Sequence, residues 1–169
     1  MKEMKNDFRL QYPLWQMGFI ILLGAFAYGL SSPMTEVVNT ETENSIMISI
    51  GGAQSLFAMI ALLLYFILLA VFAYQLRKHN KNNPHQKVSA FSIRPPEYLE
   101  QDEGMTYITR KAAQKVYTFI TWSLPLLAAF AIILPLPKLF IIWGILLVAL
   151  GQYWIYYREV RSHLKEDAE

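Results

Sequence analysis

The chain has 169 residues, of which 54% are hydrophobic and 17% are charged, and its formal net charge is +2. The apolar residues are gathered in long blocks, a pattern typical of a membrane protein rather than of a soluble domain. The small net charge gives no indication of nucleic-acid binding, and the lack of cysteine excludes disulfides, thiolate metal sites and a cysteine nucleophile.

Four apolar segments are long enough to cross a bilayer as helices, because about 20 helical residues span a hydrocarbon core of about 30 Å. The predicted spans are residues 14–30, 46–76, 116–134 and 139–157. They predict one all-α integral membrane domain, residues 1–169, with two antiparallel helix hairpins forming a four-helix bundle. The first span is expected to be retained, because its apolar run is longer than that of a typical secretory signal.

The stretch between the first two spans is acidic. Residues 31–45 contain Glu36, Glu41 and Glu43 and no Lys or Arg, so the positive-inside rule predicts an external loop. The second span would reach roughly 46 Å as one helix, which exceeds the bilayer core. We expect a bend or an interfacial start at the Gly51-Gly52 pair, since each glycine weakens a helix by about 1 kcal/mol.

A polar connector, residues 77–115, separates the two pairs of spans and contains eight of the fifteen Lys and Arg residues. With both termini and the connector in the cytoplasm, fourteen of the fifteen basic residues lie inside and Lys138 lies outside. This distribution follows the positive-inside rule. We therefore predict a multi-pass protein of the cell membrane, most simply the bacterial inner membrane.

The middle of the connector combines apolar residues with a proline pair and is followed by an acidic run. The two prolines restrict the backbone, so this piece is expected to be ordered by contact with a partner. The residues predicted to bind a protein partner are Phe91, Ile93, Arg94, Pro95, Pro96, Tyr98 and Leu99.

The end of the connector has the pattern of a basic amphipathic helix that starts near Asp102. Met105, Ile108, Ala112 and Val116 recur at intervals of three or four residues. The pattern fits a stop-transfer flank packed on neighbouring helix ends, or recognition of an anionic lipid or a partner helix. The predicted anionic-lipid contacts are Arg77, Lys78, Arg110, Lys111, Lys115 and Arg158.

The spans contain no Asp, Glu, Lys, Arg or His away from their ends, which argues against a proton-coupled carrier. Polar side chains that could lie at membrane depth are Gln16, Gln54, Ser55, Ser123 and Gln152. His79 and His85 lie six residues apart in an Asn-rich turn, which is a poor metal-binding pattern. The sequence therefore predicts no catalytic residue, no cofactor site and no metal site.

Three functions are compared on this basis. The leading hypothesis is a non-enzymatic membrane protein that binds a partner through the connector, such as an accessory subunit, assembly factor, regulator or immunity-type protein. The alternative is a small transporter or pore built from several copies. A lipid-modifying enzyme is disfavoured, because its only candidate groups are the acidic run and His163. Glycines that would let copies of a pore pack closely are Gly24, Gly29, Gly51, Gly52, Gly144 and Gly151.

Overall fold

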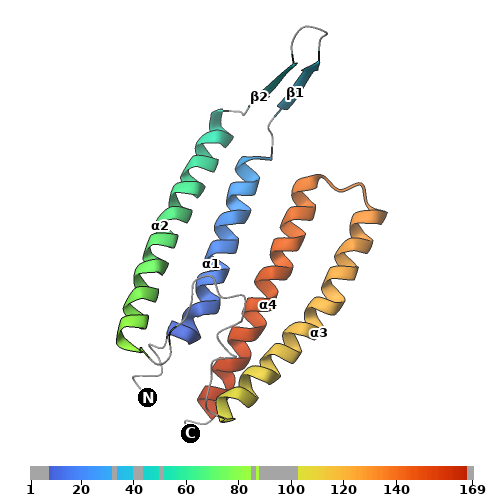
Figure 1. Ribbon diagram of the computed structural model, residues 1–169. Coiled ribbons are helices and arrows are strands. Elements are labelled where there is room, and N and C mark those ends of the chain that lie inside the picture. Colours follow the sequence, from blue (N-terminus) through green and yellow to red (C-terminus); the bar gives the residue numbers. More distant parts are fainter. Residues whose placement is uncertain are drawn as a thin grey trace.

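The computed structural model describes residues 8–31, 34–39, 44–49, 52–84, 87 and 103–166. These residues form four helices and two strands (Figure 1). The elements are α1 Phe8–Gly29, β1 Met34–Asn39, β2 Asn44–Ser49, α2 Gly52–Asn82, α3 Glu103–Ile133 and α4 Lys138–Glu166. All four helices are long and apolar enough to cross a membrane, which confirms the prediction of a helical multi-pass protein.

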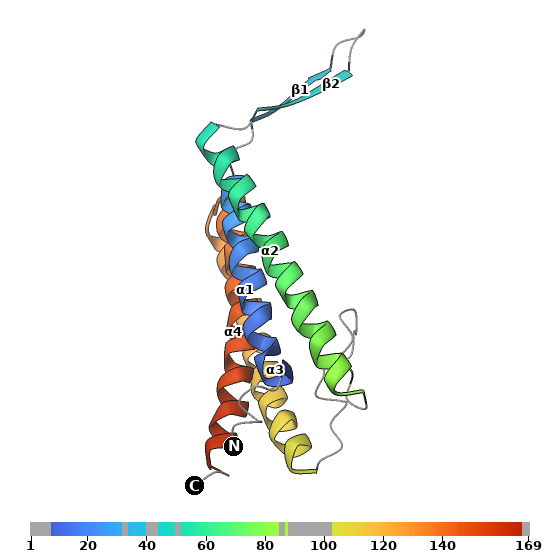
Figure 2. The same ribbon diagram turned by 90° about the vertical axis from the view of Figure 1, so that its left-hand side faces the viewer.

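The helices lie in a single layer in the order α2, α1, α4, α3 (Figures 1 and 2). Contacts between helices are concentrated in the three neighbouring pairs, so α1 and α4 form the centre and α2 and α3 form the edges. The four helices expected from the sequence are present, and among the described residues they form this layer. A membrane can cover the faces of such a layer, because lipid tails cover an apolar helix face as well as another helix does.

Aromatic side chains hold α1 against α2. The Phe72 ring lies 5.9 Å from the ring of Trp15 and 5.6 Å from the ring of Phe19, and it is buried together with Leu76. Nearer the opposite end, Gly29 lies so close to Ala58 that a side chain on Gly29 would meet the backbone of α2. Small residues thus let the two backbones approach, as is common in membrane helices.

The central pair, α1 and α4, is joined by a side-chain hydrogen bond. The indole Nε1 of Trp143 donates to the backbone oxygen of Gly24 over 3.1 Å, and the Trp143 ring stacks on Tyr28. Helix α3 packs closely on α4 at two glycines of α4, Gly144 and Gly151. Each of these glycines lies against a large side chain of α3.

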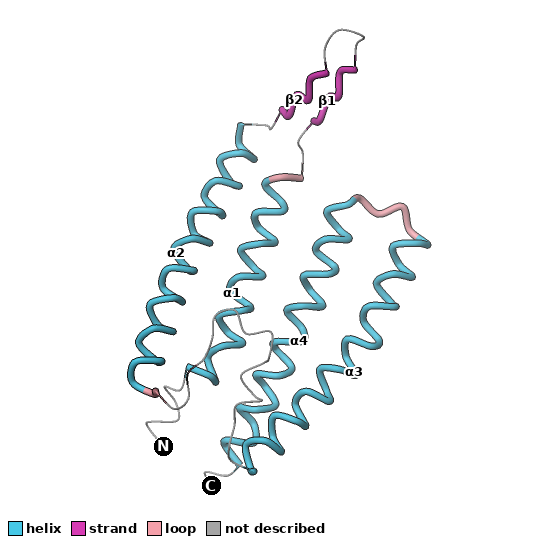
Figure 3. The backbone as a smooth tube through the Cα atoms, in the orientation of Figure 1, coloured by secondary structure: helices cyan, strands magenta, loops and turns pink. Residues whose placement is uncertain are grey.

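The segment between α1 and α2 contains a β-hairpin that the sequence did not predict (Figure 3). The strands are antiparallel, with Thr35 paired to Ile48 and Val37 paired to Ile46. The second apolar helix accordingly begins at Gly52 and not at residue 46, because residues 46–49 belong to β2. Helix α2 therefore starts at the Gly51-Gly52 pair, where the sequence predicted a bend or an interfacial start.

The other helices extend beyond the predicted spans: α1 begins at Phe8 and not at residue 14, and α4 continues to Glu166 beyond residue 157. Helix α3 is continuous from Glu103 to Ile133, so the amphipathic end of the connector and the third span are one helix, with Pro125 inside it. A short turn containing Pro135 and Pro137 leads into α4. Helix α2 extends through the basic residues that follow the second span, and ends at Asn82.

Candidate functional site at the basic end of the helix layer

One end of the helix layer contains nearly all the basic residues of the described chain. The start of α1, the end of α2, the start of α3 and the end of α4 meet there (Figure 1). We call this the basic end. Of the basic residues in the four helices, only Lys138 lies at the other end. The separation of charge along the helix axes therefore agrees with the charge distribution expected of an oriented membrane protein.

The core of this end is the contact between α3 and α4. Ile108 and Ala112 of α3 pack against Val160 of α4, and all three are buried, with Ala112 completely so. Tyr156 packs against the same group. The amphipathic pattern at the start of α3 is therefore confirmed by two of its residues, because Ile108 and Ala112 face α4. The side chain of Met105 lies outside the described residues.

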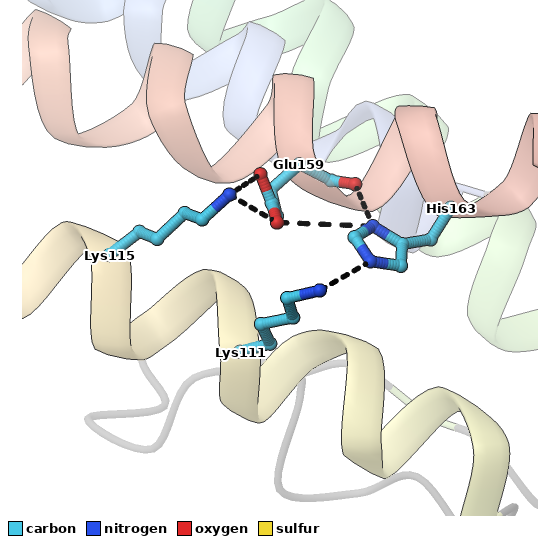
Figure 4. Close-up of polar contacts among 4 residues, drawn as sticks. All are labelled: Lys111, Lys115, Glu159 and His163. Atoms are coloured by element: carbon cyan, nitrogen blue, oxygen red, sulfur yellow. Dashed lines mark hydrogen bonds and ion pairs between the residues drawn. The ribbon is translucent and has the colours of Figure 1, made fainter.

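Beside this apolar contact, four charged or polar side chains meet between the two helices (Figure 4). The Lys115 Nζ lies 2.6 Å from both carboxylate oxygens of Glu159. The Lys111 Nζ lies 3.2 Å from Nε2 of His163, whose Nδ1 lies 3.0 Å from the backbone oxygen of Glu159. We call these residues the α3–α4 polar cluster.

The contacts of His163 fix the tautomer of its ring. A lysine ammonium has donors and no acceptor, so Nε2 of His163 must accept the hydrogen bond from Lys111. The proton of the neutral ring is then on Nδ1, which donates to the backbone oxygen of Glu159. His163 thus bridges Lys111 of α3 to the backbone of α4.

The Glu159 carboxylate is largely shielded from solvent, while its partner is not. Its side chain is 13% exposed, against 53% for Lys115. A shielded carboxylate is stabilised by a close cation, whereas a half-exposed ion pair contributes only about 0–1 kcal/mol to stability. The cluster therefore sets the position of α3 on α4 more than it stabilises the fold. It offers no pair of groups arranged as nucleophile and base among the described residues.

The predicted lipid-contact residues divide into two groups in the structure. Arg77, Lys78, Arg110 and Arg158 are exposed on helices at the basic end. In contrast, Lys111 and Lys115 reach across to α4 and have partners in the polar cluster. The residues predicted to bind a partner, from Phe91 to Leu99, lie outside the described residues.

Two residues of the cluster, Glu159 and His163, were not among the predicted site residues. A signal was present in the sequence, because His163 lies four residues after Glu159 and Lys115 lies four residues after Lys111. Residues at this spacing lie on one face of a helix. What the sequence lacked was the information that these two faces are opposed.

Two of the polar side chains predicted at membrane depth bond to the backbone of their own helix. The hydroxyl of Ser55 donates to the Gly52 oxygen, and that of Ser123 donates to the Phe119 oxygen. Within the described part of the chain, no group of three or more His, Cys, Asp or Glu residues lies close enough to hold a metal ion.

Comparison of the chain with protein-family models, with curated proteins and with solved structures found no match. The function has therefore to be inferred from the geometry and the charge of this chain alone.

Proposed function

We propose that this chain is a multi-pass membrane protein without enzymatic activity, which acts by binding another protein through the segment between α2 and α3. In this proposal α1 with α2, and α3 with α4, cross the membrane as two antiparallel hairpins. Both termini and the connector are cytoplasmic, and the membrane is a cell membrane, most simply the bacterial inner membrane. The support is the basic end, which holds every Lys and Arg of the four described helices except Lys138. In the proposed orientation fourteen of the fifteen Lys and Arg residues of the sequence are cytoplasmic.

The observation that carries the proposal is the order of the helices. The part of the connector outside the helices begins after α2 and ends at α3, and these two helices are the edges of the layer. The twenty residues between Asn82 and Glu103 therefore join opposite edges at the basic end. A protein bound to this segment would be held beneath the layer, where the ends of all four helices are within reach.

The composition of the connector supports binding to a protein. Between residues 88 and 100 it contains aromatic and aliphatic residues around Arg94, Pro95 and Pro96. Proline-containing extended segments lose little conformational entropy on binding, which favours their use in recognition. The proposed contacts are the predicted ones, from Phe91 to Leu99.

The α3–α4 polar cluster has a positioning role in this proposal. The cluster and the buried Ile108 and Ala112 fix the first turns of α3 on α4. The connector enters α3 only a few residues earlier, at Glu103. The contacts of Lys111 and Lys115 with α4 thus fix the position of the first turns of α3, which follow the partner-binding segment in the sequence.

The exposed basic residues have a separate role in this proposal. Arg77, Lys78, Arg110 and Arg158 contact anionic lipid headgroups, where each cation near the surface contributes about 1 kcal/mol. Lys111 and Lys115 contribute less to lipid contact, because they already pair with groups of α4.

The alternative, a pore built from several copies, has weaker support. A single layer of helices encloses no path, so a pore would need other copies to close it. Three of the six glycines that would let copies approach are instead packed against other helices of the same chain. Gly29 lies against Ala58, Gly144 against Leu127, and Gly151 against Phe119.

Affinity purification in mild detergent tests the proposed function. The wild-type chain should co-purify a protein in stoichiometric amount, and replacement of residues 91–99 by Gly and Ser should remove it. The matched control replaces residues 83–86 of the same connector by Gly and Ser and should retain the partner. Loss of the partner in both variants, or no stoichiometric partner of the wild-type chain, would contradict the proposal.

A further inference from the structure

The last turns of α4 have a second polar face besides the one that contacts α3 (Figure 1). The face turned to α3 carries Glu159, Val160 and His163. Aromatic and arginine side chains recur at intervals of three and four residues on the other side of the helix, namely Trp154, Tyr157, Arg158 and Arg161. Residues at this spacing share one face of a helix. We call this the α4 arginine face.

Tyr157 holds the side chain of Arg161 in place. The Nη1 of Arg161 donates a hydrogen bond to the Tyr157 hydroxyl over 2.8 Å, and the guanidinium carbon lies 5.7 Å from the centre of the Tyr157 ring. Arg161 therefore extends back by about one turn, toward the apolar part of α4, which is the direction in which helical side chains lean. Because the Tyr157 hydroxyl accepts from Arg161, its own O–H remains to donate to another group.

Trp154 indicates the depth of this face in a membrane. Its side chain is 55% exposed, and its ring lies 6.3 Å from that of Tyr157. Exposed tryptophans gather where the hydrocarbon meets the headgroups. Arg158 follows one turn later, or about 6 Å along the axis, and the Arg161 guanidinium is drawn back to Tyr157. Both arginines therefore reach the headgroup layer, which is roughly 5–8 Å thick on each side of a bilayer.

The donors of the α4 arginine face match a phosphate monoester. A guanidinium presents parallel N–H groups that bind phosphate oxygens in pairs. Arg158 and Arg161 are exposed and three residues apart, so both can reach one group, and the Tyr157 hydroxyl adds a further donor. A phosphate monoester offers three terminal oxygens and nearly two negative charges. A diester headgroup offers only two such oxygens and a single charge.

We propose that the α4 arginine face binds a phospholipid whose headgroup is a phosphate monoester, as in phosphatidic acid. Arg158 and Arg161 bind the terminal oxygens, while Tyr157 positions Arg161 and donates its hydroxyl proton to the phosphate. Trp154 packs against the start of the acyl chains. This inference rests on the proposed contact of Arg158 with anionic lipid and deepens it, because it names the headgroup and adds a site that selects it.

Native mass spectrometry of the full chain in mild detergent tests the proposal. The probes are phosphatidic acid, phosphatidylglycerol and phosphatidylcholine with identical acyl chains, and the measured quantity is the dissociation constant of the first bound lipid. Phosphatidic acid should bind about tenfold more tightly than phosphatidylglycerol, because it gains a charge-assisted hydrogen bond. Equal binding of these two lipids would overturn the proposal.

Soluble phosphates distinguish a lipid from a free ion, since the phosphate chemistry is the same. Inorganic phosphate and glycerol 3-phosphate, each in large excess, should leave phosphatidic acid bound, because neither has the acyl chains that pack on Trp154. Displacement of the lipid by either compound would show that the ligand is a soluble phosphate and that the assignment to a lipid is wrong.

Tyr157→Phe tests the geometry of the site without changing its charge. It should weaken binding of phosphatidic acid about tenfold and leave binding of phosphatidylglycerol nearly unchanged. The matched control is Tyr117→Phe, at an exposed tyrosine of α3, which should change neither. An unchanged preference for phosphatidic acid in Tyr157→Phe, or its loss in Tyr117→Phe, would contradict the site.

Arg161→Gln tests whether the position of the charge matters. It should abolish the preference for phosphatidic acid, whereas Lys81→Gln, which removes the same charge from an exposed position of α2, should retain it. An equal loss of both anionic lipids in Arg161→Gln would overturn the site and leave the general lipid contact of the basic end standing. Because the proposed function rests on co-purification through residues 91–99, either proposal can fail without the other.

Discussion

The close approach of α1 and α2 at Gly29 gives a quantitative prediction for Gly29→Ala. A Cβ on Gly29 would lie 2.7 Å from the Cβ of Ala58 and 2.8 Å from its backbone Cα and nitrogen. Carbon atoms pack at about 3.5–4.0 Å, so the helices would have to separate by roughly 0.7–1.3 Å. The obstacle is backbone, which cannot rotate away as a side chain does.

Overpacking of this kind typically costs about 1–3 kcal/mol. Alanine gains at most about 1 kcal/mol over glycine in a helix, and less at the last residue of α1. We therefore expect Gly29→Ala to lose about 1–2 kcal/mol of stability. The control is Gly52→Ala, because a Cβ on Gly52 has nothing within 4 Å and should cause no loss.

The assay is unfolding in mixed micelles with an increasing fraction of sodium dodecyl sulfate. Tryptophan fluorescence reports the loss of tertiary contacts, since Trp15 packs on Phe72 and Trp143 packs on Tyr28. Equal stability of Gly29→Ala and the wild-type chain would refute the close packing of α1 on α2. An equal loss in Gly52→Ala would show that the effect does not come from packing.

Three further predictions use the same unfolding assay. Ala112→Leu should lose about 1–3 kcal/mol of stability, because Ala112 is fully buried between α3 and α4. The control Ala113→Leu, on the exposed face of α3, should have little effect. Equal losses of stability in the two variants would contradict the packing of α3 on α4. Trp143→Phe should lose roughly 0.6 kcal/mol of stability, because it removes the hydrogen bond to Gly24. The control Trp122→Phe, at an exposed position, should leave stability unchanged. A larger loss in Trp122→Phe than in Trp143→Phe would exclude this bond. A double-mutant cycle of Lys115→Ala and Glu159→Ala should give a coupling energy of about 0.5–1 kcal/mol that falls as salt is added, and zero coupling at low salt would show that the ion pair does not form.

The helices themselves could be predicted from the sequence because each has its own local signal. Long apolar runs identified the four spans, and the glycine pair indicated a bend or an interfacial start at the place where α2 begins, although the span was predicted from residue 46. The spacing of Ile108 and Ala112 identified the face of α3 that packs on α4. These are properties of neighbouring residues along one helix.

The order of the helices could not be predicted in this way. A helix that is apolar on all sides gives no indication of which face meets another helix and which meets lipid. The neighbouring positions of α1 and α4 depend on particular contacts, such as that of Trp143 with Gly24, which join residues far apart in the chain. The same holds for Lys115 and Glu159, which come together only because α3 packs on α4.

The hairpin was missed for a different reason. Ile46, Met47 and Ile48 continue directly into the apolar residues of α2, so they extended the predicted span. A short apolar run has no period that distinguishes strand from helix. Pairing with β1 decides the structure here, and this pairing is not visible in β2 alone.

The most direct test of the proposed function is cross-linking in the native membrane. A photoreactive amino acid is introduced at Tyr98, inside the proposed partner-binding segment, and at Lys87, outside it. We predict one discrete cross-linked protein from position 98 and none from position 87. Cross-links from position 98 to lipid alone, or only to this chain, would contradict the claim that the connector binds a partner protein.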